Sequence, residues 1–335
     1  MKHTLYFTAP GRVEVREETL APLGDDEVLV ETVCSAISAG TEMLLYHGRF
    51  PRDVEADAAI AGLRGPCEYP IAYGYACVGR VKKIGKSVNA NWLEKLVFSF
   101  QPHTSHFIAK PESLLSIPDS LLPESACFLP NMETAVNLVQ DGAPILGECV
   151  LVSGQGVVGL LTTSLLNEFP LNTLITSDCF PLRREASLAR HVTASLNPEA
   201  PEFRSRLSGY APDGFDLVYE LSGNPLALND AVQVTRYSGR VVIGSWYGEK
   251  ESPLNLGGAF HRSRVKMIAS QVSTVAPELS ARWDKSRRFG VAWEALRRIQ
   301  PEKWITHRFP LSQAAEAYRL LDERPHETIQ VLLTY

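Results

Sequence analysis

The chain has 335 residues, of which 45% are hydrophobic and 21% are charged, and its formal net charge at pH 7 is −5. This length predicts two domains with separate cores, and the balanced composition excludes a disordered or fibrous chain. Charges of both signs are interspersed, so nothing indicates nucleic acid or an anionic membrane surface as a partner.

Neither the start of the chain nor its cysteines indicate export. Residues 1–7 lack an apolar core of signal-peptide length, and no segment approaches the length of a transmembrane span. The six cysteines are scattered and form no C-x-x-C pair, as is usual for thiols that pack as small hydrophobes in a reducing compartment. We therefore expect a cytoplasmic protein.

The part of the chain before residue 124 is rich in strand patterns and turn residues. Short segments of alternating apolar and polar residues predict strands at 13–17, 27–33, 79–85, 96–100 and 105–109. Such a set can wrap as a small, mostly β barrel. Residues 124–140 then have a helical pattern and lead into the next domain.

The most informative segment follows, at residues 148–161, with the sequence ECVLVSGQGVVGLL. A β-branched strand leads into G-x-G-x-x-G and then into an apolar helix, which is the entry of a dinucleotide-binding βαβ unit. Gly154 permits the tight turn, Gly156 lets the backbone approach a pyrophosphate, and Gly159 lets helix and strand pack closely. Val157 and Val158 open the helix, whose free N–H groups favour phosphate. A doubly wound domain without nucleotide is the alternative.

The next strands supply further candidate cofactor residues. A strand at 172–177 ends at Asp178, about 20 residues beyond the last glycine, where a ribose-binding acid is expected. A carboxylate there favours NAD, whereas Arg183 and Arg184 lie close enough in sequence to reach the 2′-phosphate of NADP, so both cofactors stay open. Strands are predicted next at 215–220, 239–244 and 265–270. We assign three residues at the ends of the first two of these strands to the ribose and nicotinamide side of the cofactor: Ser222, Ile243 and Ser245.

The C-terminal part has a different character. Residues 287–299 and 311–321 have amphipathic helical patterns, and residues 329–335 predict a final strand. A strand at this point needs a sheet to join. The N-terminal β domain is its natural host.

This order of elements resembles the medium-chain dehydrogenase/reductase superfamily over essentially the whole chain. The motifs that carry the resemblance lie at residues 36–42, 46–48, 69–81, 219–223 and 308–311. It implies an α/β protein with a GroES-like, mostly-β catalytic domain at 1–128 and 276–335, and a doubly wound parallel-sheet Rossmann domain at 129–275. It also implies a homodimer that pairs through the sheet edge around residues 265–275.

The zinc positions of this superfamily are changed in the chain. Where zinc-dependent members carry C-G-[ST]-[DE], residues 39–42 read A-G-T-E, and where they carry G-H-E, residues 74–76 read G-Y-A. The third ligand would fall near residues 130–131, which are P-N, and the segment of the structural zinc, about 95–115, has no cysteine. We therefore expect no zinc. The pattern is most similar to a zinc-free branch that includes a bacteriochlorophyllide dehydrogenase.

A different metal site is a weaker alternative. His103 and His106 form an H-x-x-H, but in a β context with Pro102 beside them the two rings need not point the same way. Histidines that line a pocket or cap a turn are the simpler interpretation.

The resemblance also implies catalytic candidates. Thr41 matches the position whose hydroxyl touches the substrate oxygen, and the Tyr75 phenol either donates to that oxygen or fills the space left by zinc. Glu42 orients a basic group or is structural, and His47 is a proton-relay candidate or a solvated turn histidine. The residues that would line the substrate pocket are Phe100, His103 and Asn131.

Together these features predict a zinc-independent, NAD(P)-dependent oxidoreductase that acts on a small-molecule alcohol or ketone. An enoyl or quinone reductase that acts on an activated double bond is the first alternative. A nucleotide-binding protein without catalysis is the alternative from another class.

Overall fold

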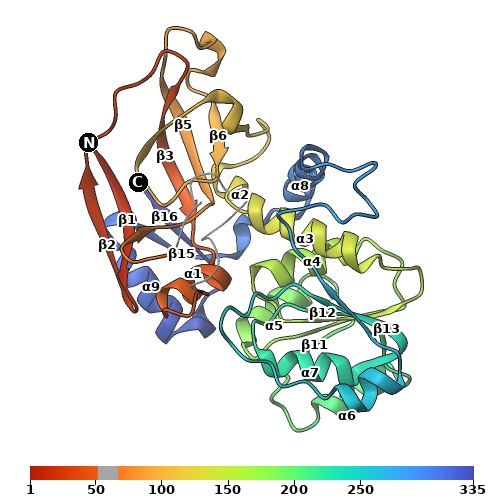
Figure 1. The fold of residues 1–335 in the computed structure, drawn as a ribbon. Helices are drawn as coiled ribbons and strands as arrows, with labels where there is room; N and C mark the ends of the chain where they lie inside the picture. Colours follow the sequence, from red (N-terminus) through yellow and green to blue (C-terminus); the bar gives the residue numbers. More distant parts are fainter. Residues whose placement is uncertain (52–66) are drawn as a thin grey trace. The chain divides into compact units, whose positions relative to one another are not determined.

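The computed structural model describes residues 1–51 and 67–335, which form two compact units (Figure 1). The first unit comprises Met1–Pro130 and Leu296–Tyr335, and the second comprises Asn131–Ala295. The chain thus leaves the first unit once and returns to it near its end.

The first unit is built mainly from strands. Its elements are β1 (Lys2–Ala9), β2 (Arg12–Glu18), β3 (Val28–Ala36), α1 (Ala39–Tyr46), β4 (Ile71–Ala72), β5 (Cys77–Ile84), η2 (Ala90–Trp92), β6 (Leu96–Ser99), β7 (His106–Ala109), η3 (Pro111–Ser113), β8 (Leu115–Ser116), α2 (Pro123–Ala126), η5 (Pro301–Trp304), β15 (Ile305–Pro310), η6 (Leu311–Gln313), α9 (Ala314–Glu323), η7 (Pro325–Glu327) and β16 (Gln330–Thr334). A seven-stranded sheet has the order β15-β16-β3-β5-β6-β8 with β7 beside β3, and a second sheet has the order β2-β1-β4.

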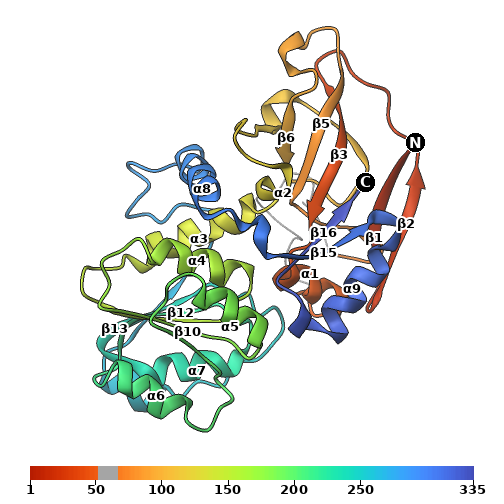
Figure 2. The same cartoon turned by 180° about the vertical axis from the view of Figure 1, so that it is seen from behind.

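The predicted strands of this unit are confirmed, including the last one. β16 lies antiparallel to β3, with Leu332 opposite Ala36, and parallel to β15. The first strand, β1, was not predicted. It pairs with β2 through a turn at Gly11, whose φ of +72° suits glycine. Figure 2 shows α9 beside β1 and β2, and the Phe7 ring of β1 packs edge-on against Tyr318 of α9 at 5.2 Å.

The second unit alternates helices with parallel strands. Its elements are α3 (Leu129–Gly142), β9 (Cys149–Ser153), α4 (Val157–Leu166), β10 (Thr173–Ser177), α5 (Pro181–Leu188), β11 (Ala194–Leu196), α6 (Phe203–Tyr210), β12 (Phe215–Glu220), α7 (Pro225–Val234), β13 (Thr235–Ile243), η4 (Leu256–Phe260), β14 (Lys266–Ala269) and α8 (Lys285–Ile299). The six strands are all parallel, in the order β11-β10-β9-β12-β13-β14. This is the doubly wound dinucleotide-binding order, whose switch point lies between β9 and β12. The predicted α/β fold class is therefore confirmed.

The sheet of this unit is buried on both faces, which explains its near-continuous apolar strands. Along β9, Val150 and Val152 pack with Leu138 of α3 on one face, whereas Leu151 packs with Leu207 and other residues of α6 and α7 on the opposite face. Figure 1 shows these helices on the two sides of the sheet.

The helical segment predicted at 124–140 is confirmed and consists of two helices. α2 ends at Ala126 and α3 begins at Leu129. Pro130 explains the break, because a proline fits the first turn of a helix but clashes with the carbonyl four residues earlier when it lies inside one. At the other end, the second unit continues to Ala295, whereas the sequence placed the return to the first domain at residue 276.

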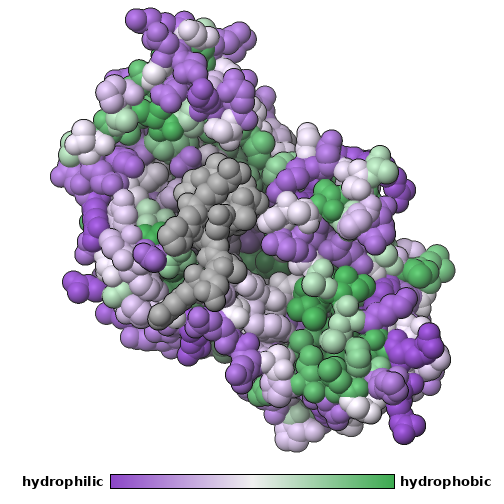
Figure 3. Space-filling view, viewed as in Figure 1, coloured by the Kyte–Doolittle hydropathy of each residue, from purple (hydrophilic) through white to green (hydrophobic). Residues whose placement is uncertain are grey.

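In residues 1–51 and 67–335, no helix combines the length and the apolar character needed to cross a membrane. Hydrophilic side chains occupy most of the face that Figure 3 shows. A contiguous group of apolar residues lies on part of the second unit.

Candidate functional site

The three glycines after β9 differ in what a side chain would meet. A Cβ at Gly154, where φ is +91°, would lie 2.6 Å from the Leu221 backbone, and a Cβ at Gly159 would lie 2.0 Å from the Gly154 carbonyl oxygen. A Cβ at Gly156 would meet no heavy atom within 4 Å. Gly154 and Gly159 are therefore required by the fold, whereas the open space at Gly156 suits the close approach of a ligand to the backbone.

Asp178 lies directly after β10 and is 7% exposed. Its carboxylate accepts the backbone N–H of Gln155 at 2.8 Å and that of Phe180 at 2.9 Å. It therefore holds the glycine turn and the start of the next turn together. The sequence suggested only ribose binding for this residue, and the contact with Gln155 was not anticipated.

The two arginines after Asp178 lie in α5 and differ in their contacts. Arg184 donates to the backbone carbonyls of Asp178 at 2.8 Å and Cys179 at 2.7 Å. The Arg183 guanidinium lies over the Phe180 ring, 4.8 Å from its centroid, and burial lowers its pKa from the usual arginine value. Arg184 thus supports the turn around Asp178.

A buried carboxylate also ends β12. Glu220 is completely buried and accepts the backbone N–H of Ser222 at 2.9 Å and the Tyr247 phenol. The Ser245 hydroxyl, just after β13, accepts the N–H of Gly223 at 2.9 Å. The sequence singled out Ser222, Ser245 and Ile243 here but missed Glu220, although an acid at the end of an apolar strand was a visible signal.

These residues share one edge of the parallel sheet, the edge at which the strands end. The glycine turn with Val157 and Val158 follows β9, Asp178 follows β10, and the two serines follow β12 and β13. In open α/β sheets this edge binds nucleotides, and the turn after the first strand meets the phosphates. The residues present therefore fit a dinucleotide.

At the positions that the resemblance assigns to a catalytic zinc, other side chains are present. Ala39 begins α1, the Tyr75 phenol donates a hydrogen bond to the Ser38 hydroxyl, and Pro130 and Asn131 lie in the first turn of α3. Within the described ranges, 1–51 and 67–335, no group of three or more His, Cys, Asp or Glu is arranged to hold a metal. A methyl, a phenol, a proline ring and an amide do not form the donor set of a catalytic zinc.

The first unit contains a buried polar cluster around Glu42. Glu42 and His103 are completely buried, and the His103 Nε2 lies 3.1 Å from Glu42 Oε2. His103 Nδ1 lies 2.7 Å from the Ser35 hydroxyl, Glu42 Oε1 accepts the Ser38 N–H at 2.7 Å, and the Tyr318 phenol donates to Glu42 Oε2. Burial and the adjacent Glu42 raise the pKa of Tyr318 well above its usual value.

The order serine, histidine, glutamate in this cluster is also that of a hydrolase triad. Ser35, His103 and Glu42 are all completely buried, however, so no substrate reaches the serine hydroxyl. A buried ionisable group needs hydrogen-bonding partners, and this cluster supplies them. We therefore interpret it as part of the framework that holds α1 against the strands.

The structure places the remaining candidates separately. Thr41 is half-buried on α1, and His47, at the end of α1, pairs with Asp322 of α9 at 2.7 Å. Phe100 is half-buried and packs edge-on against Phe98 at 5.0 Å. Asn131 is 9% exposed. His103 has a different setting from the pocket residue that the resemblance implies, because both of its ring nitrogens are engaged inside the cluster.

The H-x-x-H segment does not bring its two histidines onto one ligand. His103 lies inside the Glu42 cluster, whereas His106 Nδ1 lies 3.0 Å from the hydroxyl of Ser105. The interpretation as turn or framework histidines therefore describes their contacts better than a metal role.

Comparison with known proteins agrees with the fold. A family model described as zinc-binding dehydrogenase matches residues 157–287. Sorbitol dehydrogenase of Bacillus subtilis is 25% identical over 280 residues, which cover 72% of this chain and 75% of that protein.

Two solved structures match over nearly their whole length. A short-chain alcohol dehydrogenase of E. coli CFT073 complexed with NADH has a TM-score of 0.79 at 17% identity, and covers 100% of this chain and 99% of its own. A protein assigned as a zinc-binding dehydrogenase of Sinorhizobium meliloti 1021, bound to NADP, has a TM-score of 0.78 at 18% identity with the same coverage. The chain is therefore similar in sequence, over part of its length, to zinc-type alcohol dehydrogenase-like proteins, and the two solved structures share its fold.

Proposed function

We propose that this protein is a zinc-independent, NAD(P)-dependent oxidoreductase that interconverts a small-molecule alcohol and its ketone. The observation that carries the proposal is the nucleotide edge of the second unit, combined with the loss of every ligand type at the three family zinc positions. The relatives named above are dehydrogenases, which supports the reaction class. The proposal includes two further points: that the chain belongs to the zinc-free branch, and that it works without zinc.

The chain's residues suit the two halves of a dinucleotide. The N–H groups of Val157 and Val158 and the open face of Gly156 would receive the pyrophosphate. Asp178 would accept the adenosine ribose hydroxyls, because each of its oxygens has a lone pair beyond those used by Gln155 and Phe180. When bound, the nicotinamide supplies or accepts the hydride.

Without zinc, hydroxyl groups would have to polarise the substrate oxygen. The Thr41 hydroxyl has no hydrogen-bond partner in the described part of the chain, so it is available to a substrate. The Tyr75 phenol lies against Ser38 and is only half-buried. We assign Thr41 to the substrate oxygen and Tyr75 to the donor role that the metal performs in zinc-dependent relatives.

The first test is a fluorescence titration of the metal-analysed protein with NADH and then with NADPH. We expect NADH to bind more tightly, because the Asp178 carboxylate repels a 2′-phosphate and Arg184 is occupied with backbone carbonyls. Tighter NADPH binding would shift the assignment to NADP. Absence of binding to either would overturn the oxidoreductase proposal.

The second test is Tyr75→Phe, with Tyr6→Phe as the matched control. Tyr6 is another phenol of the first unit, and it donates to Glu18 far from the zinc positions in sequence. We expect Tyr75→Phe to lower kcat about 100-fold with unchanged NADH affinity, which is the usual size for loss of one polarising donor. Unchanged turnover would make Tyr75 a residue that merely fills the space of the zinc.

The same assays separate the alternatives. Consumption of NADPH with enones or quinones and no oxidation of alcohols would identify an enoyl or quinone reductase. Tight nucleotide binding without turnover of alcohols, ketones, enones or quinones would identify a binding protein. Homodimer formation through the edge strand β14 and a cytoplasmic location remain predictions, which gel filtration and cell fractionation check.

A further inference from the structure

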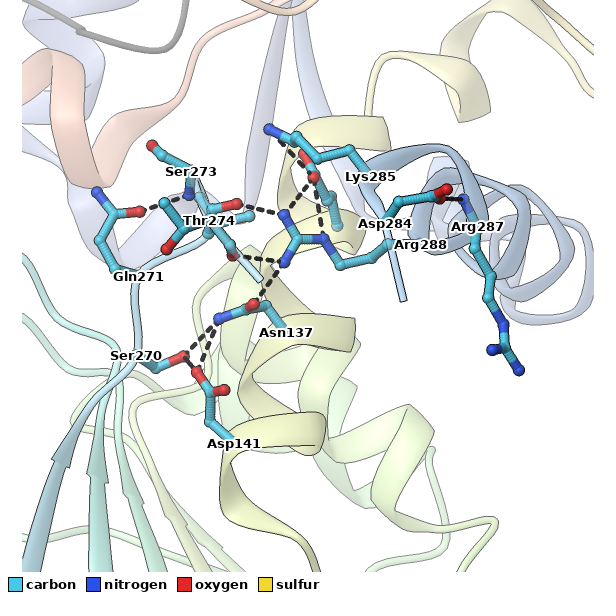
Figure 4. A network of polar contacts seen from close by, with 12 residues as sticks. Asn137, Asp141, Ser270, Gln271, Ser273, Thr274, Asp284, Lys285, Arg287 and Arg288 are labelled. Atoms are coloured by element: carbon cyan, nitrogen blue, oxygen red, sulfur yellow. Dashed lines mark hydrogen bonds and ion pairs between the residues drawn. The ribbon is translucent and has the colours of Figure 1, made fainter. Parts of the chain in front are cut away.

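Helix α8 carries a completely buried arginine, Arg288, in the second unit (Figure 4). Its guanidinium donates to Glu133 Oε1 through Nε at 3.1 Å and through Nη2 at 2.8 Å. Nη1 donates to Asn137 Oδ1 at 2.6 Å. Both acceptors lie on α3, so Arg288 joins α8 to α3.

The other two N–H groups of the Arg288 guanidinium donate to backbone carbonyls. They go to the carbonyl oxygens of Val272 and Thr274, the latter at 3.0 Å, in the loop that directly follows β14. All five N–H groups of the guanidinium are therefore used within the protein. None remains for a ligand, so Arg288 acts on its surroundings through the loop.

A second link holds the beginning of the same loop. The Ser270 hydroxyl donates to Asp141 Oδ2 at 2.7 Å and lies 2.9 Å from Asn137 Nδ2, and Asn137 Nδ2 also donates to Asp141 at 2.8 Å. Figure 4 shows these side chains as one network with Arg288. Residues 270–274 are thus fixed at three points by α3 and α8.

This loop lies on the nucleotide edge of the sheet. It leaves the carboxyl end of β14, and the Ser270 N–H donates to the Ile243 carbonyl at the end of β13 at 3.0 Å. In the strand order, β13 and β14 lie on the opposite side of the switch point from β10, which ends at Asp178. With the adenosine half at Asp178, the β13–β14 side receives the nicotinamide half.

A gain in folding stability does not by itself explain why the ion pair of Arg288 and Glu133 is buried. Taking an arginine and a glutamate out of water costs several kcal/mol, and well-packed apolar residues are often at least as stable. An apolar residue at position 288 would, however, leave the Val272 and Thr274 carbonyls without these donors and the loop free to move. The guanidinium is suited to holding several acceptors in one fixed geometry.

We propose that Arg288 is a positioning residue that fixes loop 270–274 for the nicotinamide half of the dinucleotide. This inference rests on the proposed nucleotide-binding function. It predicts that loss of Arg288 weakens binding of the nicotinamide half and leaves binding of the adenosine half intact.

The test compares Arg288→Met with the wild type in titrations with NADH, followed by fluorescence, and with ADP-ribose, followed by calorimetry. ADP-ribose has the adenosine, pyrophosphate and second ribose but lacks the nicotinamide. We expect the NADH affinity to fall about tenfold and the ADP-ribose affinity to stay within about twofold. Arg288→Lys, which keeps the charge but not the five-donor geometry, should lie between the two.

The matched control is Arg240→Met. Arg240 also bonds to a glutamate, Glu148, and to three backbone carbonyls, those of Gly142, Ala143 and Asp216. Gly142 and Ala143 lie before β9, at the opposite edge of the sheet. It should lower thermal stability as Arg288→Met does but leave the ratio of NADH to ADP-ribose affinity unchanged.

Unchanged NADH affinity in Arg288→Met, or equal loss of both ligands, would overturn the proposal. If Arg288→Met does not fold, Ser270→Ala replaces it, since this change removes only the hydroxyl link of the loop. A loss of NADH affinity of about threefold with ADP-ribose unchanged then supports the proposal, and no selective loss overturns it. A wild type that binds neither ligand would instead refute the proposed function.

Discussion

The two units bury carboxylates for different purposes. At the nucleotide edge of the second unit, Asp178 and Glu220 accept backbone N–H groups at strand ends, and they shape an edge that stays open at Gly156. In the first unit, Glu42 is enclosed by the side chains of His103 and Tyr318. One arrangement prepares a surface for a ligand, and the other joins three segments of the chain into a framework.

This contrast predicts which substitutions affect binding and which affect stability. Some substitutions at the nucleotide edge should destabilise the fold itself. Others should leave the free energy of unfolding unchanged and lower only the affinity for the nucleotide. Changes in the Glu42 cluster should lower stability and leave nucleotide affinity unchanged.

The largest effect is expected for Gly159→Ala. The new Cβ would lie 2.0 Å from the Gly154 carbonyl oxygen, so α4 must move away from β9. We expect a loss of about 3 kcal/mol in the free energy of unfolding, measured in urea, together with loss of NADH binding. Gly209→Ala in α6 is the control, because its Cβ meets nothing within 4 Å and should not destabilise the protein. Equal stability of the two variants would contradict this account of the glycine turn.

The next effect is expected for His103→Ala. It removes a buried donor from Glu42 and a partner from Ser35, and it leaves a cavity. We expect destabilisation by about 2–3 kcal/mol and NADH affinity within about twofold of wild type. His106→Ala, a half-buried histidine three residues away, should cost far less. If the His103→Ala protein is stable but has lost turnover, this result would instead support the substrate-pocket role of His103 that the resemblance implies.

Gly156→Ala should sharpen the comparison further. Its Cβ meets no protein atom within 4 Å and φ there is −65°, so the free energy of unfolding should change by less than about 0.5 kcal/mol. The methyl would, however, occupy the space where the backbone approaches the pyrophosphate. We expect NADH affinity to fall about tenfold in a fluorescence titration. Unchanged affinity would mean that the nucleotide does not approach this turn.

The smallest effect is expected for His47→Ala. The pair with Asp322 is partly exposed, and exposed pairs contribute about 0.2–1 kcal/mol. Thermal denaturation should therefore show little change, and kcat should stay within about twofold of wild type if the histidine only pairs α1 with α9. A tenfold fall in kcat with unchanged stability would support the proton-relay hypothesis.

The sequence predicts the structure best where the physical requirement involves only neighbouring residues. The glycine spacing, the apolar strands and the acid after the second strand predicted the sheet that the structure shows, with Asp178 at its expected strand end. The helical character predicted at 124–140 is confirmed, but periodicity alone did not reveal the break before Pro130 that divides the segment into two helices. A helix boundary of this kind is set by a single residue, whereas the periodic pattern averages over many residues.

The sequence by itself determined the two-part α/β architecture and the nucleotide edge, because glycine at a positive φ and apolar alternation constrain the backbone within a few residues. Only the tertiary structure decided the partners of the buried polar groups. Glu42 meets His103 and Tyr318, which are 61 and 276 residues away, and Arg288 meets Glu133 across 155 residues. The physical reason is that a buried charge requires hydrogen-bonding partners but does not specify where in the chain they come from.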